Sequence, residues 1–148
     1  MSLESLYQAL ILKHYRDPRH RGTLETPDAS VRMRNPTCGD EIGLFLGIRD
    51  GRIETLRFQG EGCSISQASA SMMASLLEGR TLAEASAIAQ RFTEMLHGDA
   101  QAARDPSLGD LRALVGVARY PARVRCALLA WNALAEAQRS LEAEEEPR

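Results

Sequence analysis

Three cysteines and one aspartate are the residues of this chain whose types and surroundings suit thiol or metal chemistry. Cys38 lies between Pro36 and Gly39, two residues that predict a turn and so place the thiol in a loop. Because Gly39 allows unusual backbone angles, the side chains of Cys38 and Asp40 can point to one place. A thiolate and a carboxylate are both metal ligands, and the pair therefore suggests a cation site.

The other two cysteines lie near the predicted starts of helices. Cys63 follows Gly60 and Gly62. Cys126 lies five residues after Pro121, in the predicted first turn of the last helix. A helix N-terminus favours the thiolate, the form that binds metals or attacks sulfur, although a single cysteine also fits a small buried core residue. The three cysteines are separated by 25 and 63 residues, so the fold must assemble any shared site.

Composition narrows the class of protein. A chain of 148 residues, 44% of them hydrophobic, fits one domain, which we assign to residues 1–148. The formal net charge of -2 gives no reason to expect a nucleic acid partner. No apolar run is long enough to span a membrane, and residues 1–12 lack the pattern of a secretory signal. We therefore expect a soluble, cytoplasmic protein whose cysteines stay reduced rather than forming a disulfide framework.

A period of two in the first half of the chain predicts a small antiparallel sheet. Residues 42–48 alternate between apolar and other side chains, as in a strand with one buried face. Asp50 and Gly51 predict a tight hairpin turn, and residues 53–58 predict the partner strand. Residues 31–34 predict a third, shorter strand.

Apolar residues spaced by three and four predict helices around this sheet. Five are expected: residues 2–17, from Gly62 to Gly79, from Thr81 to His97, residues 107–118, and from Pro121 towards the carboxyl end. Met72, Met73 and Trp131 lie on apolar stripes and are expected in the core. Residues 16–27 predict a mobile surface connection, and residues 142–148 a flexible acidic tail. The predicted class is α+β, a small antiparallel three-stranded sheet packed against several helices.

Histidines and two arginines near the cysteines have simpler interpretations. His14, His20 and His97 have no ligand spacing to the cysteines, and we expect ordinary surface roles for them. Arg34 and Arg125 lie close in sequence to the candidate site. These arginines either balance its negative charge, dock an acidic surface of a partner, or are simply solvated.

The cysteines lie in three segments that form a pattern together with the predicted hairpin. The segments are 34–40 (Arg-Asn-Pro-Thr-Cys-Gly-Asp), 58–69 (Phe-Gln-Gly-Glu-Gly-Cys-Ser-Ile-Ser-Gln-Ala-Ser) and 124–131 (Val-Arg-Cys-Ala-Leu-Leu-Ala-Trp). This pattern resembles the U-type iron-sulfur cluster assembly proteins, the IscU/NifU N-terminal family, over roughly residues 5–140. The resemblance implies that Cys38, Asp40, Cys63 and Cys126 form one site for zinc or for a nascent iron-sulfur cluster.

Two departures from the scaffold proteins of that family indicate its SufU-like branch. IscU scaffolds have a histidine directly before the last cysteine, within a Leu-Pro-Pro-Val-Lys segment that a dedicated chaperone binds. Here residues 120–125 are Tyr-Pro-Ala-Arg-Val-Arg, so Arg125 stands in place of the histidine. The stretch between Cys63 and Cys126 also contains an insertion around residues 90–111, as in SufU-like proteins. The chain is identified as a member of that branch.

The SufU-like resemblance implies a zinc-dependent sulfurtransferase in iron-sulfur cluster assembly. Such a protein accepts persulfide sulfur from a PLP-dependent cysteine desulfurase of the SufS type and works with downstream assembly components. We expect Cys38 to be the catalytic thiolate because its turn can swing, whereas Cys63 and Cys126 are tied to helices. Two alternatives remain: a scaffold that assembles a [2Fe-2S] cluster on the same residues, and a domain in which zinc only holds the fold together.

Overall fold

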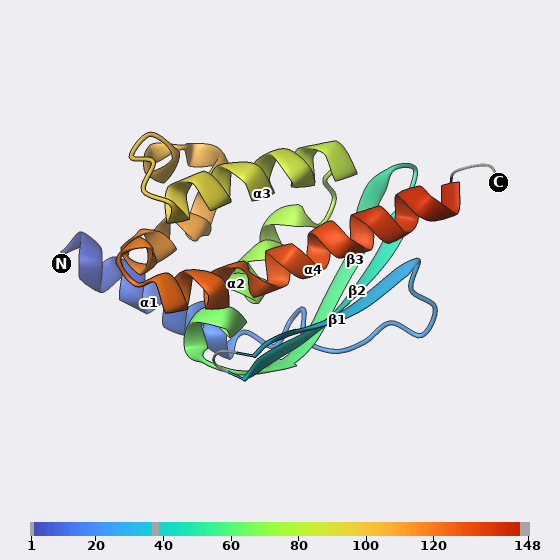
Figure 1. Cartoon of the computed structure of the whole chain (residues 1–148), viewed down its shortest axis with the longest axis horizontal. Helices are drawn as coiled ribbons and strands as arrows, with labels where there is room; N and C mark the ends of the chain where they lie inside the picture. Colours follow the sequence, from blue (N-terminus) through green and yellow to red (C-terminus); the bar gives the residue numbers. More distant parts are fainter. Residues whose placement is uncertain (1, 37–38, 146–148) are drawn as a thin grey trace.

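The computed structural model describes residues 2–36 and 39–145, with the backbone alone for residues 144 and 145. Its elements, in chain order, are α1 Leu3–Arg16, β1 Ala29–Asn35, β2 Asp40–Arg49, β3 Arg52–Glu61, α2 Ser64–Leu77, α3 Leu82–Leu96, the 3-10 helices η1 Ala102–Arg104 and η2 Pro106–Arg119, and α4 Pro121–Glu145. Figure 1 shows α4 running across the strands, with α3 on the side of α4 away from the sheet. α4 packs on β1 and β2, and α2 packs on β3. The predicted α+β class is confirmed.

The sheet has the order β1-β2-β3, and both neighbouring pairs are antiparallel. The hairpin between β2 and β3 turns at Asp50 and Gly51, whose φ angles of 53° and 72° are positive, as the prediction requires. The register pairs Glu41 with Glu61. The start of β2 and the end of β3 therefore lie side by side, which brings Asp40 next to the residues that lead into α2.

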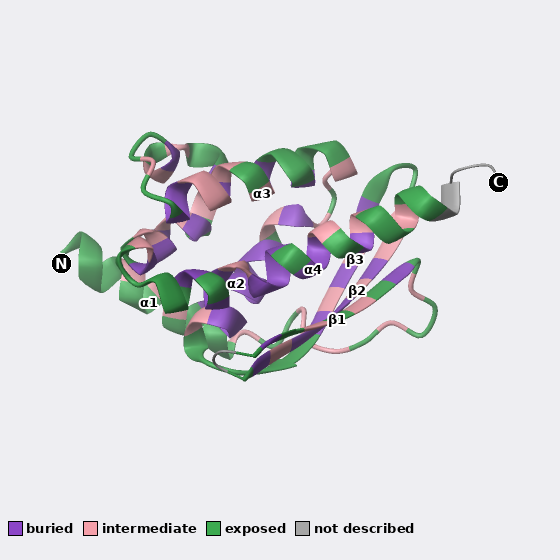
Figure 2. Cartoon of the chain, in the orientation of Figure 1, coloured by how far each residue is buried: buried purple, intermediate pink, exposed green. Residues whose placement is uncertain are grey.

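α2 is the central helix of the core. Ten of its 14 residues are buried, because α1, α4, η2 and β3 all pack against it (Figure 2). Met72 and Met73 on α2 and Trp131 on α4 are buried, which confirms their predicted core positions. Gly79, with a φ of 90°, follows the end of the helix, as the sequence predicts.

α1 buries only part of the apolar stripe that its spacing predicts, which consists of Leu3, Leu6, Tyr7, Leu10, Ile11 and Tyr15. Tyr7, Leu10 and Ile11 are partly buried, and His14 is buried. Leu3 is 62% exposed, because the N-terminal end of α1 projects beyond the other elements (Figure 1). The helix predicted over residues 2–17 is confirmed, but its core-facing part is shorter than expected.

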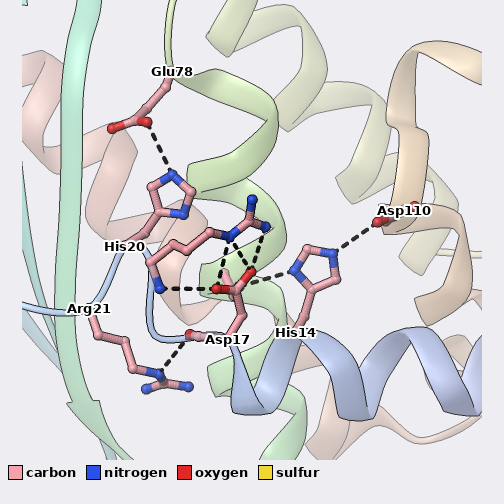
Figure 3. A network of polar contacts seen from close by, with 8 residues as sticks. His14, Asp17, His20, Arg21, Glu78 and Asp110 are labelled. Atoms are coloured by element: carbon pink, nitrogen blue, oxygen red, sulfur yellow. Dashed lines mark hydrogen bonds and ion pairs between the residues drawn. The ribbon is translucent and has the colours of Figure 1, made fainter.

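Residues 17–27 form a connection without helix or strand, as the sequence predicts for residues 16–27, and part of this connection is attached to β3. The Phe58 N–H donates a hydrogen bond to the His20 carbonyl, and the Gly22 N–H donates to the Phe58 carbonyl. The prediction of a surface role is wrong for His20, whose side chain is 12% exposed with its Nε2 3.0 Å from Glu78 Oε1 (Figure 3). Backbone pairing to an outer strand thus orders a stretch whose composition is typical of a loop.

The predicted surface role is wrong for His14 as well. His14 is 4% exposed; its Nδ1 lies 3.0 Å from Ser71 Oγ and its Nε2 lies 2.9 Å from Asp110 Oδ2 (Figure 3). Ser71 contacts His14, which contacts Asp110, and this chain of contacts is also found in the catalytic triads of hydrolases. Ser71 is only 1% exposed, however, so no substrate reaches its hydroxyl. The set therefore joins α1, α2 and η2 structurally. His97 is exposed, as predicted.

α4 is the last helix and extends further than expected. It continues to Glu145, so residues 142–145 of the predicted acidic tail are helical, and residues 146–148 lie outside the described part of the chain. Val124 and Leu134 are buried, as its apolar spacing predicts. Among residues 2–36 and 39–145, no helix is long and apolar enough to cross a membrane.

Candidate metal centre

Three elements bring a carboxylate and two thiols together. Asp40 begins β2, Cys63 is the N-cap residue of α2, and Cys126 lies on α4. Their ligand atoms, one carboxylate oxygen and two Sγ atoms, all lie within 4.8 Å of one another. Zinc with bonds of about 2.0–2.3 Å would separate tetrahedral ligands by roughly 3.3–3.8 Å. Small side-chain shifts therefore suffice for all three residues to share one ion.

The two carboxylate oxygens of Asp40 have different surroundings. Oδ1 accepts a hydrogen bond of 3.0 Å from the Cys63 N–H, whereas Oδ2 lies 3.6 Å from Cys63 Sγ. Asp40 is 1% exposed, and Cys63 makes no side-chain capping bond of its own. Oδ1 thus accepts a hydrogen bond from a backbone N–H at the start of α2, and Oδ2 lies next to the Cys63 thiol.

Gly62 allows the close approach of the Asp40 carboxylate to α2. Its φ of 151° falls in a region that residues with a side chain rarely adopt. A Cβ atom at this position would overlap the Asp40 carboxylate and come within 2.9 Å of Ser66 Oγ. The glycine before Cys63 is therefore required by the packing of the site.

Ser66 is a residue of this site that sequence reasoning missed. It is 2% exposed, and its hydroxyl donates a 3.0 Å hydrogen bond to the Cys63 carbonyl. The same oxygen lies 3.9 Å from Cys63 Sγ. The only available signal was its spacing, three residues after a cysteine that begins a helix. The Ser66 hydroxyl therefore holds the Cys63 backbone at the start of α2 and lies beside its thiol.

The two described thiols differ in exposure. Cys63 is exposed, as suits a residue at the start of a helix. Cys126 is 5% exposed and is the sixth residue of α4, which begins at Pro121. The prediction that Cys126 lies in the first turn is wrong, because one further turn separates it from the helix end, where the dipole acts most strongly.

The fourth predicted ligand, Cys38, lies outside the described residues. The residues that border the undescribed positions 37 and 38 lie close together: the Gly39 N–H donates a 2.9 Å hydrogen bond to the Asn35 carbonyl, and Asn35 pairs with Asp40 in the β1-β2 ladder. The end of β1 and the start of β2 are therefore adjacent, and Asp40 lies at this end of the ladder.

Arg34 and Arg125 are both exposed, on β1 and α4 respectively. Exposure is compatible with charge balance and with docking of an acidic partner for both residues, and with simple solvation for Arg34. Arg125 interacts with another group of the protein, so simple solvation does not describe it.

The chain is similar to known proteins over most of its length. The family described as the NifU-like N terminal domain matches residues 6–137. The zinc-dependent sulfurtransferase SufU of Bacillus subtilis (strain 168) is 43% identical over 135 residues, which cover 90% of this chain and 89% of that protein. The iron-sulfur cluster assembly scaffold protein IscU of Streptococcus pyogenes serotype M1 is 44% identical over 135 residues, covering 91% of this chain and 84% of that protein.

The fold agrees with these similarities. A nitrogen-fixing NifU-like protein (N-terminal) from Brucella abortus has a crystal structure that superposes with a TM-score of 0.86 at 28% identity, covering 97% of this chain and 99% of that one. The resemblance drawn from the cysteine segments is therefore confirmed. The chain belongs to the NifU-like N-terminal domain family, to which the SufU and IscU proteins are related in sequence.

Proposed function

We propose that this protein is a zinc-dependent sulfurtransferase of iron-sulfur cluster assembly that accepts sulfur from a cysteine desulfurase. The observation that carries the proposal is the convergence of Asp40, Cys63 and Cys126. The similarity to the Bacillus subtilis zinc-dependent sulfurtransferase supports both zinc and sulfur transfer. With Cys38 as the fourth ligand, the donor set is three thiols and a carboxylate, which zinc accepts in tetrahedral geometry.

Each residue has a defined role in this proposal. Zinc, when bound, holds its cysteine ligands as thiolates near neutral pH. Asp40 offers Oδ2 as a ligand while Oδ1 keeps its hydrogen bond to the Cys63 N–H, which holds the start of α2 in place. Cys63 and Cys126 supply sulfur ligands from α2 and α4. The negative charge of this donor set disfavours activation of water, so the site suits sulfur chemistry better than hydrolysis.

Sulfur acceptance is an exchange between a thiolate and a persulfide. The desulfurase, which we propose to be PLP-dependent and of the SufS type, carries the sulfur removed from cysteine as a persulfide on its own cysteine. The Cys38 thiolate attacks the terminal sulfur, a new S–S bond forms on Cys38, and the S–S bond of the desulfurase breaks. The desulfurase cysteine leaves as a thiolate and takes up a proton from solvent. No external oxidant or reductant is needed, and downstream assembly components then receive the sulfur.

Cys38 is the proposed acceptor because the other two thiols are held more firmly. Cys126 is 5% exposed within α4. Cys63 is exposed, but its backbone N–H is hydrogen-bonded to Asp40. The sequence predicts a turn at Cys38, between Pro36 and Gly39, and a thiol in a turn has more freedom to meet a partner than a thiol on either helix. We place this reaction in the cytoplasm, where thiols stay reduced.

The test of the proposal locates the transferred sulfur. The protein is incubated with a SufS-type desulfurase and cysteine, alkylated, and digested without reduction for peptide mass spectrometry. We expect the persulfide on Cys38, and we expect the Cys38→Ser variant to lose stimulation of desulfurase turnover. Persulfide found mainly on Cys63 or Cys126, together with an active Cys38→Ser variant, would overturn the assignment.

A second candidate function is a scaffold that assembles a [2Fe-2S] cluster on the same residues. It is favoured by the 44% identity to the Streptococcus pyogenes scaffold protein. Anaerobic purification followed by metal analysis distinguishes the two functions. A coloured protein that contains iron and acid-labile sulfide would support the scaffold, whereas a colourless zinc protein that accelerates a desulfurase supports sulfur transfer.

A zinc ion that only holds the fold together is the third possibility. The core includes Leu44, Phe58, Met73, Phe92 and Leu114, all fully buried among apolar neighbours rather than around a metal. Because such a core can stabilise the fold by itself, we expect the protein to stay folded after zinc is removed by a chelator. Unfolding of the metal-free protein, observed by circular dichroism, would favour the structural role.

A further inference from the structure

α2 contains several buried polar residues, and each of them bonds to a different part of the molecule. Ser66 bonds to the Cys63 carbonyl, Gln67 accepts from Arg21, Ser69 bonds to α4, and Ser71 bonds to His14. Buried polar groups in a core helix are normally paired, and their partners show which neighbours must keep a fixed position. Ser69 is the one that links the helix of Cys63 to the helix of Cys126.

We propose that Ser69 is a positioning residue that sets Cys126 opposite Cys63, an inference that rests on the proposed function of this site. Ser69 is fully buried, and its hydroxyl donates a 2.6 Å hydrogen bond to the carbonyl of Ala127, the residue after Cys126. The same oxygen accepts a 3.1 Å hydrogen bond from Trp131 Nε1. One hydroxyl therefore contacts α4 at two points, one beside the buried thiol and one a turn further on.

A hydrogen bond is suited to fixing the position of α4 against α2 because it is directional, whereas apolar packing has little directionality. α2 and α4 pack against each other, and both helices bury small side chains, Ala68 on α2 and Ala130 and Ala133 on α4, whose apolar burial alone does not fix how far one helix is shifted along the other. A tetrahedrally coordinated metal ion tolerates only small displacements of its ligands, whereas an apolar contact tolerates larger displacements of its side chains. Ser69 lies six residues after Cys63, about 9 Å along the helix, so its bond to Ala127 couples the positions of the two thiols.

Two variants separate the bond to Ala127 from the bond to Trp131. Ser69→Ala removes both bonds and leaves the buried indole N–H without an acceptor. Trp131→Phe keeps the bond from Ser69 to Ala127 and keeps an aromatic ring next to Phe92, whose ring centroid lies 5.2 Å from that of Trp131. If Ser69→Ala fails to fold, the double variant Ser69→Ala with Trp131→Phe is used in its place, because this double variant also lacks the indole N–H that has lost its acceptor.

Phenylarsine oxide measures the position of the two thiols independently of zinc. In a Cys38→Ser background only Cys63 and Cys126 remain, and the reagent forms two As–S bonds and releases water when both thiols reach one arsenic. The metal-free variants are titrated with this reagent, and Co(II) absorption spectra of the metal-loaded forms, with Cys38 restored, record the ligand geometry. Circular dichroism confirms that each variant is folded.

We expect Ser69→Ala, or the double variant, to bind the arsenical and Co(II) at least about tenfold more weakly, with a changed Co(II) spectrum. Trp131→Phe should stay within about twofold of the parent, because the bond to Ala127 is retained. Parent-like binding and spectrum in folded Ser69→Ala, or an equal loss in Trp131→Phe, would overturn the proposal. A parent that takes up neither zinc nor sulfur would instead refute the proposed function, and the arsenical comparison would still decide the role of Ser69.

Discussion

The two ends of α2 use buried polar groups in opposite ways. At the N-terminal end, the carboxylate of Asp40 and the thiols of Cys63 and Cys126 converge, and all of their ligand atoms are electron-rich. From the middle of the helix to just beyond its C-terminal end, donors face acceptors: Ser71 meets His14, and Glu78 meets His20 (Figure 3). Thiolates and a carboxylate this close together repel one another unless a cation lies between them, whereas complementary pairs are stable by themselves.

This difference distinguishes the candidate binding site at the N-terminal end of α2 from the structural network around Ser71 and Glu78. Glu78 also accepts hydrogen bonds from Arg57 Nη1 at 2.9 Å and from the Leu56 N–H at 2.9 Å, so its charge is balanced within the protein. At the other end of the helix, a bound metal would balance the charge of ionised thiols beside the Asp40 carboxylate. Substitutions at the N-terminal end should therefore change metal binding first, and substitutions in the network should change stability first.

The largest expected effect is the loss of zinc on removal of a thiol. We expect about one zinc per chain in the parent, and a decrease in affinity of more than roughly 100-fold in Cys63→Ala and in Cys126→Ala, because each loses a ligand. Metal analysis and competition with a chromophoric chelator measure the change. Ser64→Ala, an exposed residue next to Cys63, is the matched control. Full zinc content at neutral pH in either cysteine variant would show that the proposed site is wrong.

Asp40 allows the ligand role and the structural role of one carboxylate to be separated. Asp40→Asn keeps an oxygen that can accept from the Cys63 N–H, so we expect weaker zinc binding, by about 10- to 100-fold, with little loss of stability. Asp40→Ala loses both roles and should in addition destabilise the protein by about 1 kcal/mol.

Chelator competition and chemical denaturation of the metal-free protein measure the two quantities for Asp40. Zinc binding and sulfur acceptance equal to those of the parent in Asp40→Ala would mean that Asp40 is not a ligand. Equal stability of the two metal-free variants would contradict the structural role of the Oδ1 atom.

His14 tests the other side of the comparison. Replacement by alanine removes the contacts to Ser71 and Asp110 and leaves a buried hydroxyl poorly paired, so we expect a loss of about 2 kcal/mol in the free energy of unfolding. Zinc affinity of the folded protein should not change. Urea denaturation measures the stability, with the exposed His97→Ala as control. Reduced zinc affinity in folded His14→Ala would mean that the two ends of α2 are coupled.

The smallest expected effect is a change in the pH dependence of stability at Asp17. The side chain of Arg19 donates hydrogen bonds to Asp17, and together with the Arg19 backbone N–H it holds the pKa of this carboxyl well below its usual range. A lowered pKa in the folded protein stabilises it above about pH 4, and this contribution is lost as the pH falls towards the lower folded value.

Asp17→Asn should therefore show a shallower loss of stability below pH 4 than the parent does. Thermal denaturation between about pH 2 and 5, a range that includes the pH at which the unfolded carboxyl titrates, provides the measurement. The exposed Glu142→Gln serves as control, and zinc affinity at neutral pH should stay at the parental value. An unchanged acid slope in Asp17→Asn would contradict the role of this ion pair.

Several elements could be predicted from short stretches of sequence because their causes are local. Asp50 and Gly51 form the expected turn because few other residues accept positive φ angles. Residues 81–84, Thr-Leu-Ala-Glu, match the sequence pattern of a capping box, and Thr81 and Glu84 form one, in which each side chain accepts from the backbone of the other. The start of α2 at Cys63, directly after Gly62, could likewise be predicted from neighbouring residues.

Residues whose partners lie far along the chain could not be assigned in this way. His14 lies four residues after Leu10 on the buried side of α1, but its partners Ser71 and Asp110 are 57 and 96 residues away. Polar residues on a helix give no sign of which distant group they will meet. The burial of Ser69 against Ala127 could not be inferred for the same reason.

The sequence alone determined the residue types of the candidate site, the turns and helix starts that surround them, and the family to which they belong, because backbone preferences act over a few neighbouring residues. Only the tertiary structure decided that Asp40, Cys63 and Cys126 share one place, that Cys126 is buried in the second turn of its helix, and that His14 lies in the core. These outcomes depend on how β2, α2 and α4 pack together, and packing joins side chains across long separations that no local pattern encodes.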